Sequence, residues 1–135
     1  MSEVRSMPRP QAIVAGECAS FILYPEKRLV VLTLGDRITL QLLEEYSSLL
    51  RRDPRFELTF SEIADMTAVQ EIALEADEMM RMADQVDPFS PDSKRAFVVK
   101  TPTQAHAARM HKILLTHRHF EIFRSLQEAE RWIQA

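Results

Sequence analysis

Four histidines lie close together near the C-terminus, and histidine is a common metal ligand. They are His106, His111, His117 and His119. A zinc site needs three or four ligands that converge on one point. On a helix each residue turns by about 100°, so His106 and His111 would point in different directions. No cysteine lies nearby. We therefore interpret these residues as surface or helix-end histidines and predict no metal site.

Five carboxylates between residues 71 and 84 are a second candidate for chemistry. They are Glu71, Glu75, Asp77, Glu78 and Asp84. A catalytic carboxylate pair must face its partner across the substrate, and no such geometry follows from this spacing. The run could be an acidic docking face. The solvated side of an amphipathic helix is the commoner arrangement, and we favour it.

Other catalytic patterns are missing from the sequence. Its two glycines, Gly16 and Gly35, stand apart, whereas loops that cradle phosphates need several glycines within a few residues. The Gly-x-Ser-x-Gly motif of serine hydrolases does not occur. The single cysteine, Cys18, lies in an apolar run, where a small buried side chain is a commoner role than a nucleophile. We predict a protein that is not an enzyme, with no catalytic residue and no cofactor.

The elements that would position a site alternate between strands and helices. Short apolar or alternating runs bounded by turn residues predict strands, at residues 11–15, 19–24, 29–34, 56–64, 96–99 and 120–124. Apolar residues at helical spacing predict helices, over residues 39–52 and 67–86, from residue 101 and from residue 125.

This alternation predicts an α/β fold: a single, mostly parallel sheet of about five strands, with an N-terminal hairpin and four helices on its faces. Pro25 lies in the connection of the hairpin, where proline favours a turn. Three helix starts carry the Ser/Thr-x-x-Glu/Gln pattern of a capping box. The pairs are Thr67 with Gln70, Thr101 with Gln104, and Ser125 with Glu128.

Ligands of open α/β sheets bind beyond the carboxyl ends of the parallel strands. Two predicted helices begin at that edge, and free N–H groups at helix N-termini favour an anion such as a carboxylate or phosphate. We therefore predict a partner or ligand edge there. Its residues are Asp36, Asp65, Met66, Thr67, Lys100 and Thr101, with Arg109 on the following helix as a further member.

Size and charge narrow the classes of function. The chain has 135 residues and a formal net charge of -3. A nucleic-acid-binding domain needs a concentrated basic face, so we expect no nucleic-acid partner. No apolar run has the length of a signal peptide or a membrane span, so we expect a cytoplasmic protein. Residues 1–10 are interpreted as a flexible leader and residues 11–135 as a single domain.

The order of elements resembles the STAS-like domains, which have the SpoIIAA-like (anti-sigma-factor antagonist) fold. A hairpin, then Gly35-Asp36-Arg37-Ile38-Thr39 and a helix resemble the opening of that group. The closing segment, residues 123–133, is similar to the end of its bacterial members of unassigned role. The resemblance covers about residues 18 to 134. The resemblance rests on residues that begin or end helices and strands and, above all, on the order of these elements.

This resemblance implies a binding or regulatory module. In the antagonist branch, a serine that opens the helix after the third strand is phosphorylated by a partner kinase. The family pattern is an Asp-Leu-Ser-like turn followed by an Asp-Ser-Ser-Gly-like segment. Asp65-Met66-Thr67 matches the turn, whereas Ala68-Val69-Gln70-Glu71 stands in place of the segment. Whether Thr67 is phosphorylated stays open. A related branch is thought to bind lipids.

Two functions of different classes follow as expectations. The first is a non-enzymatic regulatory module that binds a protein partner. The alternative is a carrier or sensor of a small apolar or amphipathic molecule. A homodimer stays open. Methionine suits a plain core and also an adaptable apolar site, so a cavity between the methionine-rich helix and the sheet would favour the carrier. The methionines are Met66, Met79, Met80, Met82 and Met110.

Overall fold

The computed structural model describes residues 12–14, 19–117 and 119–135, with side chains from residue 19 onward. In these residues, a six-stranded sheet has the order β1-β2-β3-β5-β7-β8. Its first three strands pair antiparallel, and β3, β5, β7 and β8 pair parallel. The strands are β1 (Ala12–Val14), β2 (Ala19–Tyr24), β3 (Leu29–Leu34), β5 (Ser61–Asp65), β7 (Lys94–Val98) and β8 (His119–Phe123).

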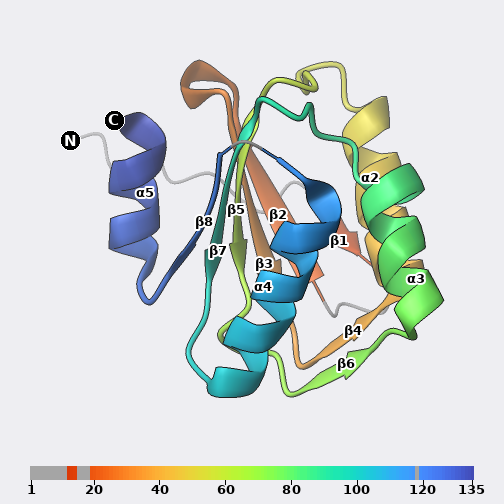
Figure 1. The fold of residues 1–135 in the computed structure, drawn as a ribbon. Helices are drawn as coiled ribbons and strands as arrows, with labels where there is room; N and C mark the ends of the chain where they lie inside the picture. The colour runs from red at the N-terminus through yellow and green to blue at the C-terminus, as the bar shows by residue number, and fades with distance from the viewer. Residues whose placement is uncertain (1–11, 15–18, 118) are drawn as a thin grey trace.

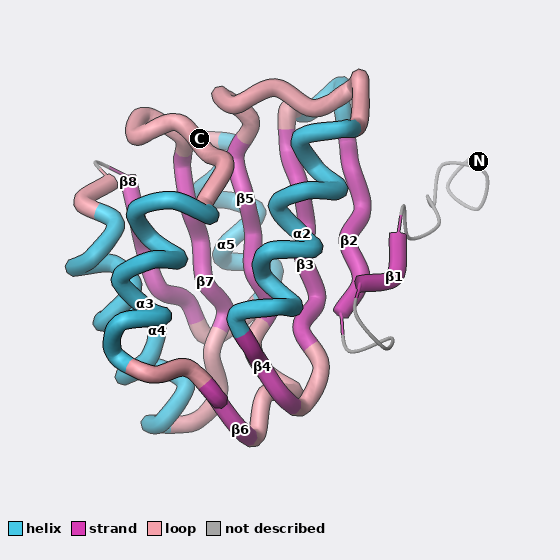
Figure 2. Tube along the Cα trace, turned by 90° about the vertical axis from the view of Figure 1, so that its right-hand side faces the viewer, coloured by secondary structure: helices cyan, strands magenta, loops and turns pink. Residues whose placement is uncertain are grey.

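Helices cover both faces of this sheet. Three of them lie on one face: α2 (Leu40–Arg52), α3 (Ala76–Arg81) and α4 (Pro102–Leu115). On the opposite face lies α5 (Leu126–Gln134), as Figures 1 and 2 show. Two short strands, β4 (Arg37–Thr39) and β6 (Glu71–Ala73), form a separate parallel pair. The predicted α/β class, the N-terminal hairpin and the four helices are confirmed.

The hairpin and the helix caps form from local signals. Between β2 and β3 lies a short 3₁₀ turn, η1 (Pro25–Lys27), which ends at Arg28 with φ 51°. Thr39 caps α2 by accepting a hydrogen bond from the N–H of Leu42 at 3.1 Å. Thr101 and Gln104 form the predicted capping box of α4. Ser125 caps α5 through the N–H of Glu128.

The core has two layers because alternate side chains of each strand point to opposite faces. The smaller layer lies under α5 and contains Leu29, Ile63, Ala96, Val98, Ala129 and Ile133. The larger layer lies under α2, α3 and α4 and includes Leu32, Ala64 and Phe97. By the same alternation, Glu62 and Arg95 point into the larger layer.

The predicted helix over residues 67–86 is wrong in its first half. Residues 71–73 form β6 instead, because the N–H groups of Gln70 and Glu71 donate to the carbonyl of Asp36 at 2.8 and 2.9 Å. The helix α3 begins only at Ala76, where Glu75 caps it. Its continuation, Met82–Val86, is a π-helical turn, η2.

Thr67 therefore opens no helix. Its N–H and its hydroxyl donate to Asp65 Oδ1, at 2.9 and 2.7 Å. Such local bonds compete with helix formation. The helix N-terminus predicted at this position is absent.

The predicted strand over residues 56–64 begins later, at Ser61. The preceding residues turn, since the N–H of Phe60 donates to the carbonyl of Glu57 at 3.0 Å. The rings of Phe56, Phe60 and Phe89 pack together, with centroids 5.7 and 5.4 Å apart. The apolar side chains of Phe56 and Phe60 thus belong to an aromatic cluster and a turn, and they do not form a strand. Cys18 and the predicted leader 1–10 lie outside the described residues.

Candidate functional site

The predicted edge is held together through one buried glutamine. At the start of α4, Gln104 Oε1 accepts hydrogen bonds from the N–H groups of Lys100 (2.7 Å) and Thr101 (3.1 Å). Its Nε2 donates to the carbonyls of Thr67 (3.3 Å) and Val69 (2.8 Å). Gln104 thus joins the loops that follow β5 and β7. The sequence singled it out as a capping residue, and its side chain also binds across to the neighbouring loop.

The other residues predicted for this edge have separate surroundings. Asp65 and Thr67 are bonded to each other, as described above. Asp36, Lys100, Thr101 and Arg109 are exposed, and Arg109 lies about two turns along α4. Met66 is buried. Of these seven residues, Met66 alone lines the cavity described next.

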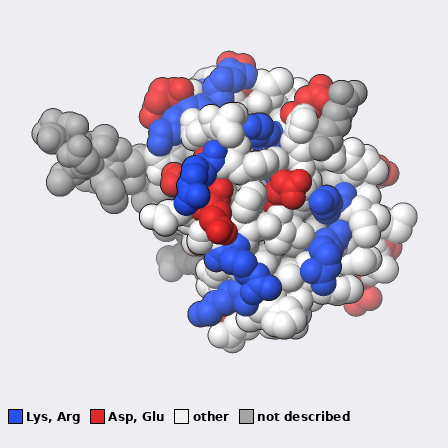
Figure 3. Space-filling model, turned by 60° about the vertical axis from the view of Figure 1, so that its left-hand side comes forward, with Lys and Arg blue, Asp and Glu red and all other residues white. Residues whose placement is uncertain are grey.

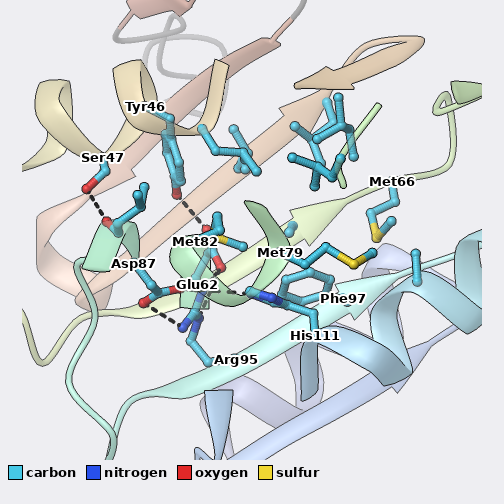
Figure 4. A pocket seen from close by; sticks show the side chains of 18 of the residues that line it. Tyr46, Ser47, Glu62, Met66, Met79, Met82, Asp87, Arg95, Phe97 and His111 are labelled. Atoms are coloured by element: carbon cyan, nitrogen blue, oxygen red, sulfur yellow. Dashed lines mark hydrogen bonds and ion pairs between the residues drawn. The ribbon is translucent and has the colours of Figure 1, made fainter. Parts of the chain in front are cut away.

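A cavity lies between the sheet and the layer of α2, α3, η2 and α4 (Figure 4). The volume of the cavity is about 90 Å³. Most of the wall is apolar, and three methionines contribute to it. The apolar lining residues are Leu32, Leu34, Ile38, Leu43, Ala64, Met66, Ile72, Leu74, Met79, Met82, Val86, Pro88, Phe89, Phe97, Ala107 and Leu114.

The other end of the cavity carries buried charges (Figure 4). Arg95 donates to Glu62 Oε1 through Nε (3.0 Å) and Nη2 (2.7 Å). It also donates to Asp87 through Nη1 (3.1 Å) and Nη2 (2.8 Å). Tyr46 of α2 donates its hydroxyl to Glu62 Oε2 at 2.7 Å. The exposed fractions of the Arg95, Glu62 and Asp87 side chains are 2%, 3% and 5%. We call these four residues the buried charge cluster.

This cluster has a net negative charge. Burial disfavours ionisation of Asp87, but Arg95 outweighs it, so the pKa of this carboxyl lies below its usual value. Burial likewise opposes the charge of Arg95, but Glu62 and Asp87 together raise the pKa of the guanidinium. Burial and then Glu62 raise the pKa of Tyr46, so its hydroxyl stays a donor. Two carboxylates therefore face one guanidinium.

His111 of α4 lies beside this cluster and lines the cavity. Its Nε2 is 4.0 Å from Asp87 Oδ2, which is too long for a direct hydrogen bond. Burial, and then Arg95, lowers the pKa of His111 to about 3, so the ring is neutral at pH 7. The ring packs against Phe97 and Phe120, with centroids 5.5 and 6.0 Å away. Within the described residues no hydrogen bond to His111 forms, so its ring offers an open polar position.

We call α3 and η2 (residues 76–86) the cover of the cavity. The cover is bonded to α2 at two places. None of the residues of α3 is buried, and Arg81 pairs at the surface with Glu44 of α2 at 3.3 Å. The π-helical turn is tied to α2 more closely, since the hydroxyl of Ser47 donates to the carbonyl of Val86 at 2.5 Å. Arg51 donates to the same carbonyl at 3.3 Å. π-helical turns occur frequently at functional sites.

Sequence reasoning missed the buried charge cluster and His111's place beside it. The available signal was a charged residue that strand alternation places on the same face as an apolar one, Glu62 with Ala64 and Arg95 with Phe97. Charged residues are almost never buried unless they are paired. Within the described residues, no three His, Cys, Asp or Glu side chains lie together in a way that could hold a metal ion.

The face that carries α5 has charges of both signs. Figure 3 shows Lys and Arg side chains, Asp and Glu side chains, and uncharged surface between them. Among the helices that the structure describes, none has the length and hydropathy to cross a bilayer.

Comparisons with known proteins find likenesses in structure. No protein-family model and no curated protein sequence matches the chain. An uncharacterized protein of the DUF3478 family with a SpoIIAA-like fold, from Shewanella loihica, is 16% identical, with a TM-score of 0.59 over 95% of this chain and 99% of that one. An anti-sigma factor antagonist from Mycobacterium paratuberculosis is 12% identical, with a TM-score of 0.57 over 90% and 99% of the two chains.

Proposed function

Because this chain has the SpoIIAA-like fold of STAS-like domains, we propose that it is a non-enzymatic regulatory module that binds another protein. The likeness to an anti-sigma factor antagonist is the observation that carries this proposal. We further propose that it acts in the cytoplasm. A homodimer remains an alternative to a different partner.

The proposed partner surface is the edge at the carboxyl ends of the parallel strands. Asp36, Lys100 and Thr101 present exposed polar groups there, and the exposed Arg109 lies about two turns further along α4. Gln104 fixes the loops that carry Thr67 and Lys100. A partner would therefore meet a surface that is already ordered, which lowers the entropic cost of binding.

Affinity capture from a lysate of the source organism tests this surface. We expect Lys100→Glu and Arg109→Glu to reduce recovery of a stoichiometric partner. Lys27→Glu is the matched control, because Lys27 is exposed in η1, at the opposite end of the sheet (Figure 1). Equal recovery by the edge variants and the control would exclude this edge as the partner surface.

Thr67→Asp tests a switch at the turn, because it places a negative charge where a phosphate would stand. Partner recovery that changes with Thr67→Asp and not with Ser48→Asp, at an exposed position of α2, supports a switch. Unaltered recovery counts against it.

The cavity favours a second function, that of a carrier or sensor of a small amphipathic molecule. Ligand sites are mostly apolar with a few placed polar groups, and this cavity combines methionine-rich walls with a buried charge cluster. Native mass spectrometry of the purified chain tests the proposal. A co-purified small molecule supports it, and a clean apo mass after mild purification argues against it.

A further inference from the structure

The charges at the polar end of the cavity favour a positive ligand group over a negative one. Glu62 and Asp87 oppose the single cation Arg95 in a buried cluster. His111 adds no charge at neutral pH. The cation Arg51 is exposed and bonds to the main-chain carbonyls of Val86 and Asp87 at 3.3 and 3.4 Å. One negative charge is thus left without a buried partner, and such charges are costly unless they are paired.

Arg95 is poorly placed to bind an acidic ligand. All three of its guanidinium nitrogens already donate to Glu62 or Asp87. These four bonds leave only one N–H of Nη1 to which a carboxylate or phosphate head could bind. Such a head would also add a further negative charge to the cluster, where like charges repel strongly.

Two acceptors are open toward the cavity. Asp87 Oδ2 accepts one hydrogen bond, from Arg95, although a carboxylate oxygen has two lone pairs. His111, when its proton is on Nδ1, offers Nε2 as an acceptor. These two atoms are 4.0 Å apart, so one donor atom could lie about 2.8 Å from both. An ammonium group has three N–H donors, whereas a hydroxyl group has one.

The size of the cavity limits the rest of the ligand. Its volume of about 90 Å³ is smaller than the ~150 Å³ of an apolar cavity that binds one benzene molecule. Met66 and Met79 line the apolar part, and methionine adapts its shape to an apolar guest. A short alkyl chain therefore fits this end.

From these observations we propose that the cavity binds a small amphipathic amine. Its ammonium head lies between Asp87 and His111, and its alkyl body lies along the methionine-lined wall. This proposal rests on the carrier or sensor function proposed above and names the class of ligand.

Isothermal titration of the full chain with three probes of equal chain length tests the head group. The probes are n-butylamine, 1-butanol and sodium butanoate, all at pH 7. We expect butylamine to bind at least about tenfold more tightly than butanol, which corresponds to ~1.4 kcal/mol. Butanoate should bind most weakly.

Two variants locate the binding site. Ala107→Leu fills the apolar wall without changing a charge, and we expect it to weaken the amine and the alcohol alike. Asp87→Asn removes one carboxylate, and we expect it to remove the preference for the amine. Asp84→Asn is the control, because Asp84 is exposed in the π-helical turn that precedes Asp87. If Asp87→Asn does not fold, the ranking of the three probes on the natural chain decides.

The outcomes separate this proposal from the function on which it rests. If the amine and the alcohol bind with equal affinity and Ala107→Leu abolishes the binding of both, the cavity binds ligands, but the proposed ammonium site is wrong. Tightest binding of butanoate would overturn it as well. A co-purified molecule without a basic nitrogen would support the carrier and contradict the amine. No binding of any probe and no co-purified molecule would overturn both.

Discussion

Glu62 and Arg95 occupy paired positions on the neighbouring parallel strands β5 and β7, and their side chains meet at 2.7 Å with almost no exposure to solvent. A third charged residue, Asp87, lies in the loop after η2 and forms an ion pair with Arg95. This relationship places an ionised cluster in the interior of the larger core layer. It decides how the protein responds to substitution of these residues.

Arg95→Met should destabilise the protein strongly, because it leaves Glu62 and Asp87 buried without a cation. Breaking a buried pair in this way typically costs about 3–5 kcal/mol, and urea unfolding measures it. Carboxyls buried without a cation have raised pKa values, so the stability of this variant should rise as the pH falls from 7. Arg37→Met is the control, since Arg37 pairs with Glu71 in solvent, and such pairs contribute about 1 kcal/mol or less. Equal losses for both variants would contradict the prediction.

His111 should make the protein less stable in mild acid. Its pKa is about 3 in the folded chain against 6.5 ordinarily, so the unfolded chain binds the proton first. The stability that the neutral ring provides is complete above pH 6.5 and is lost as the pH falls toward 3. At about 1.4 kcal/mol per pKa unit, the loss over this window is a few kcal/mol. The lowered pKa of Asp87 adds a loss of the same sign below about pH 3.8.

Urea unfolding at several pH values between 7 and 4 measures this effect. His111→Phe keeps an aromatic ring at the position and should flatten the pH dependence. His106→Phe, on the exposed side of α4, should keep the slope of the natural chain. If the pH dependence of the unfolding free energy persists in His111→Phe, a group other than His111 causes it.

Gln104→Met should cost about 1–3 kcal/mol, although the two side chains have similar volumes. The change removes the partner of four main-chain groups; the bond to the carbonyl of Val69 is buried, and the other three bonds are partly buried. A buried group left unpaired costs about 1–3 kcal/mol. Faster amide exchange at Lys100 and Thr101 should accompany the loss. Gln127→Met, at an exposed position of α5, serves as the control and should be near neutral.

Arg81→Ala should loosen the cover of the cavity without unfolding the protein. The Arg81–Glu44 pair is exposed, so its loss should change global stability by less than about 1 kcal/mol. Since α3 has no buried residue, hydrogen exchange in residues 76–86 should accelerate. Arg37→Ala removes an equivalent surface pair elsewhere and should leave exchange in this segment unchanged. Unaltered exchange in Arg81→Ala would show that other contacts hold the cover.

Local patterns predicted the fold well where local bonds decide it. The capping box of Thr101 and Gln104 needs no information beyond four consecutive residues, and the structure contains it. The same pattern at Thr67 was misleading, because β6 pairs with β4, which lies more than thirty residues earlier in the chain. That pairing replaces the first turns of the expected helix. The division into a leader (1–10) and one domain (11–135) stays a prediction.

The candidate site was harder to predict because it depends on strand register. Glu62 and Arg95 stand 33 positions apart, and the sequence does not state which residues of two strands face each other. His111 was considered as a metal ligand, whereas its neighbours are Asp87 and two phenylalanines. Of the residues predicted for the edge, Met66 alone lines the cavity, because it follows β5 directly, whereas Met79 and Met82 line it as the methionine-rich helix predicted.

The pairing of Glu62 with Arg95 also specifies how the two strands align during folding. A long crossover connects β5 to β7, so no tight turn sets their alignment. A slip of one residue would turn Arg95 toward the apolar layer under α5 and leave both carboxylates unpaired, at a cost of several kcal/mol. The ion pair thus excludes misaligned sheets more than it strengthens the native one. Two apolar residues in its place could match the stability of the native sheet while losing the uniqueness of its alignment.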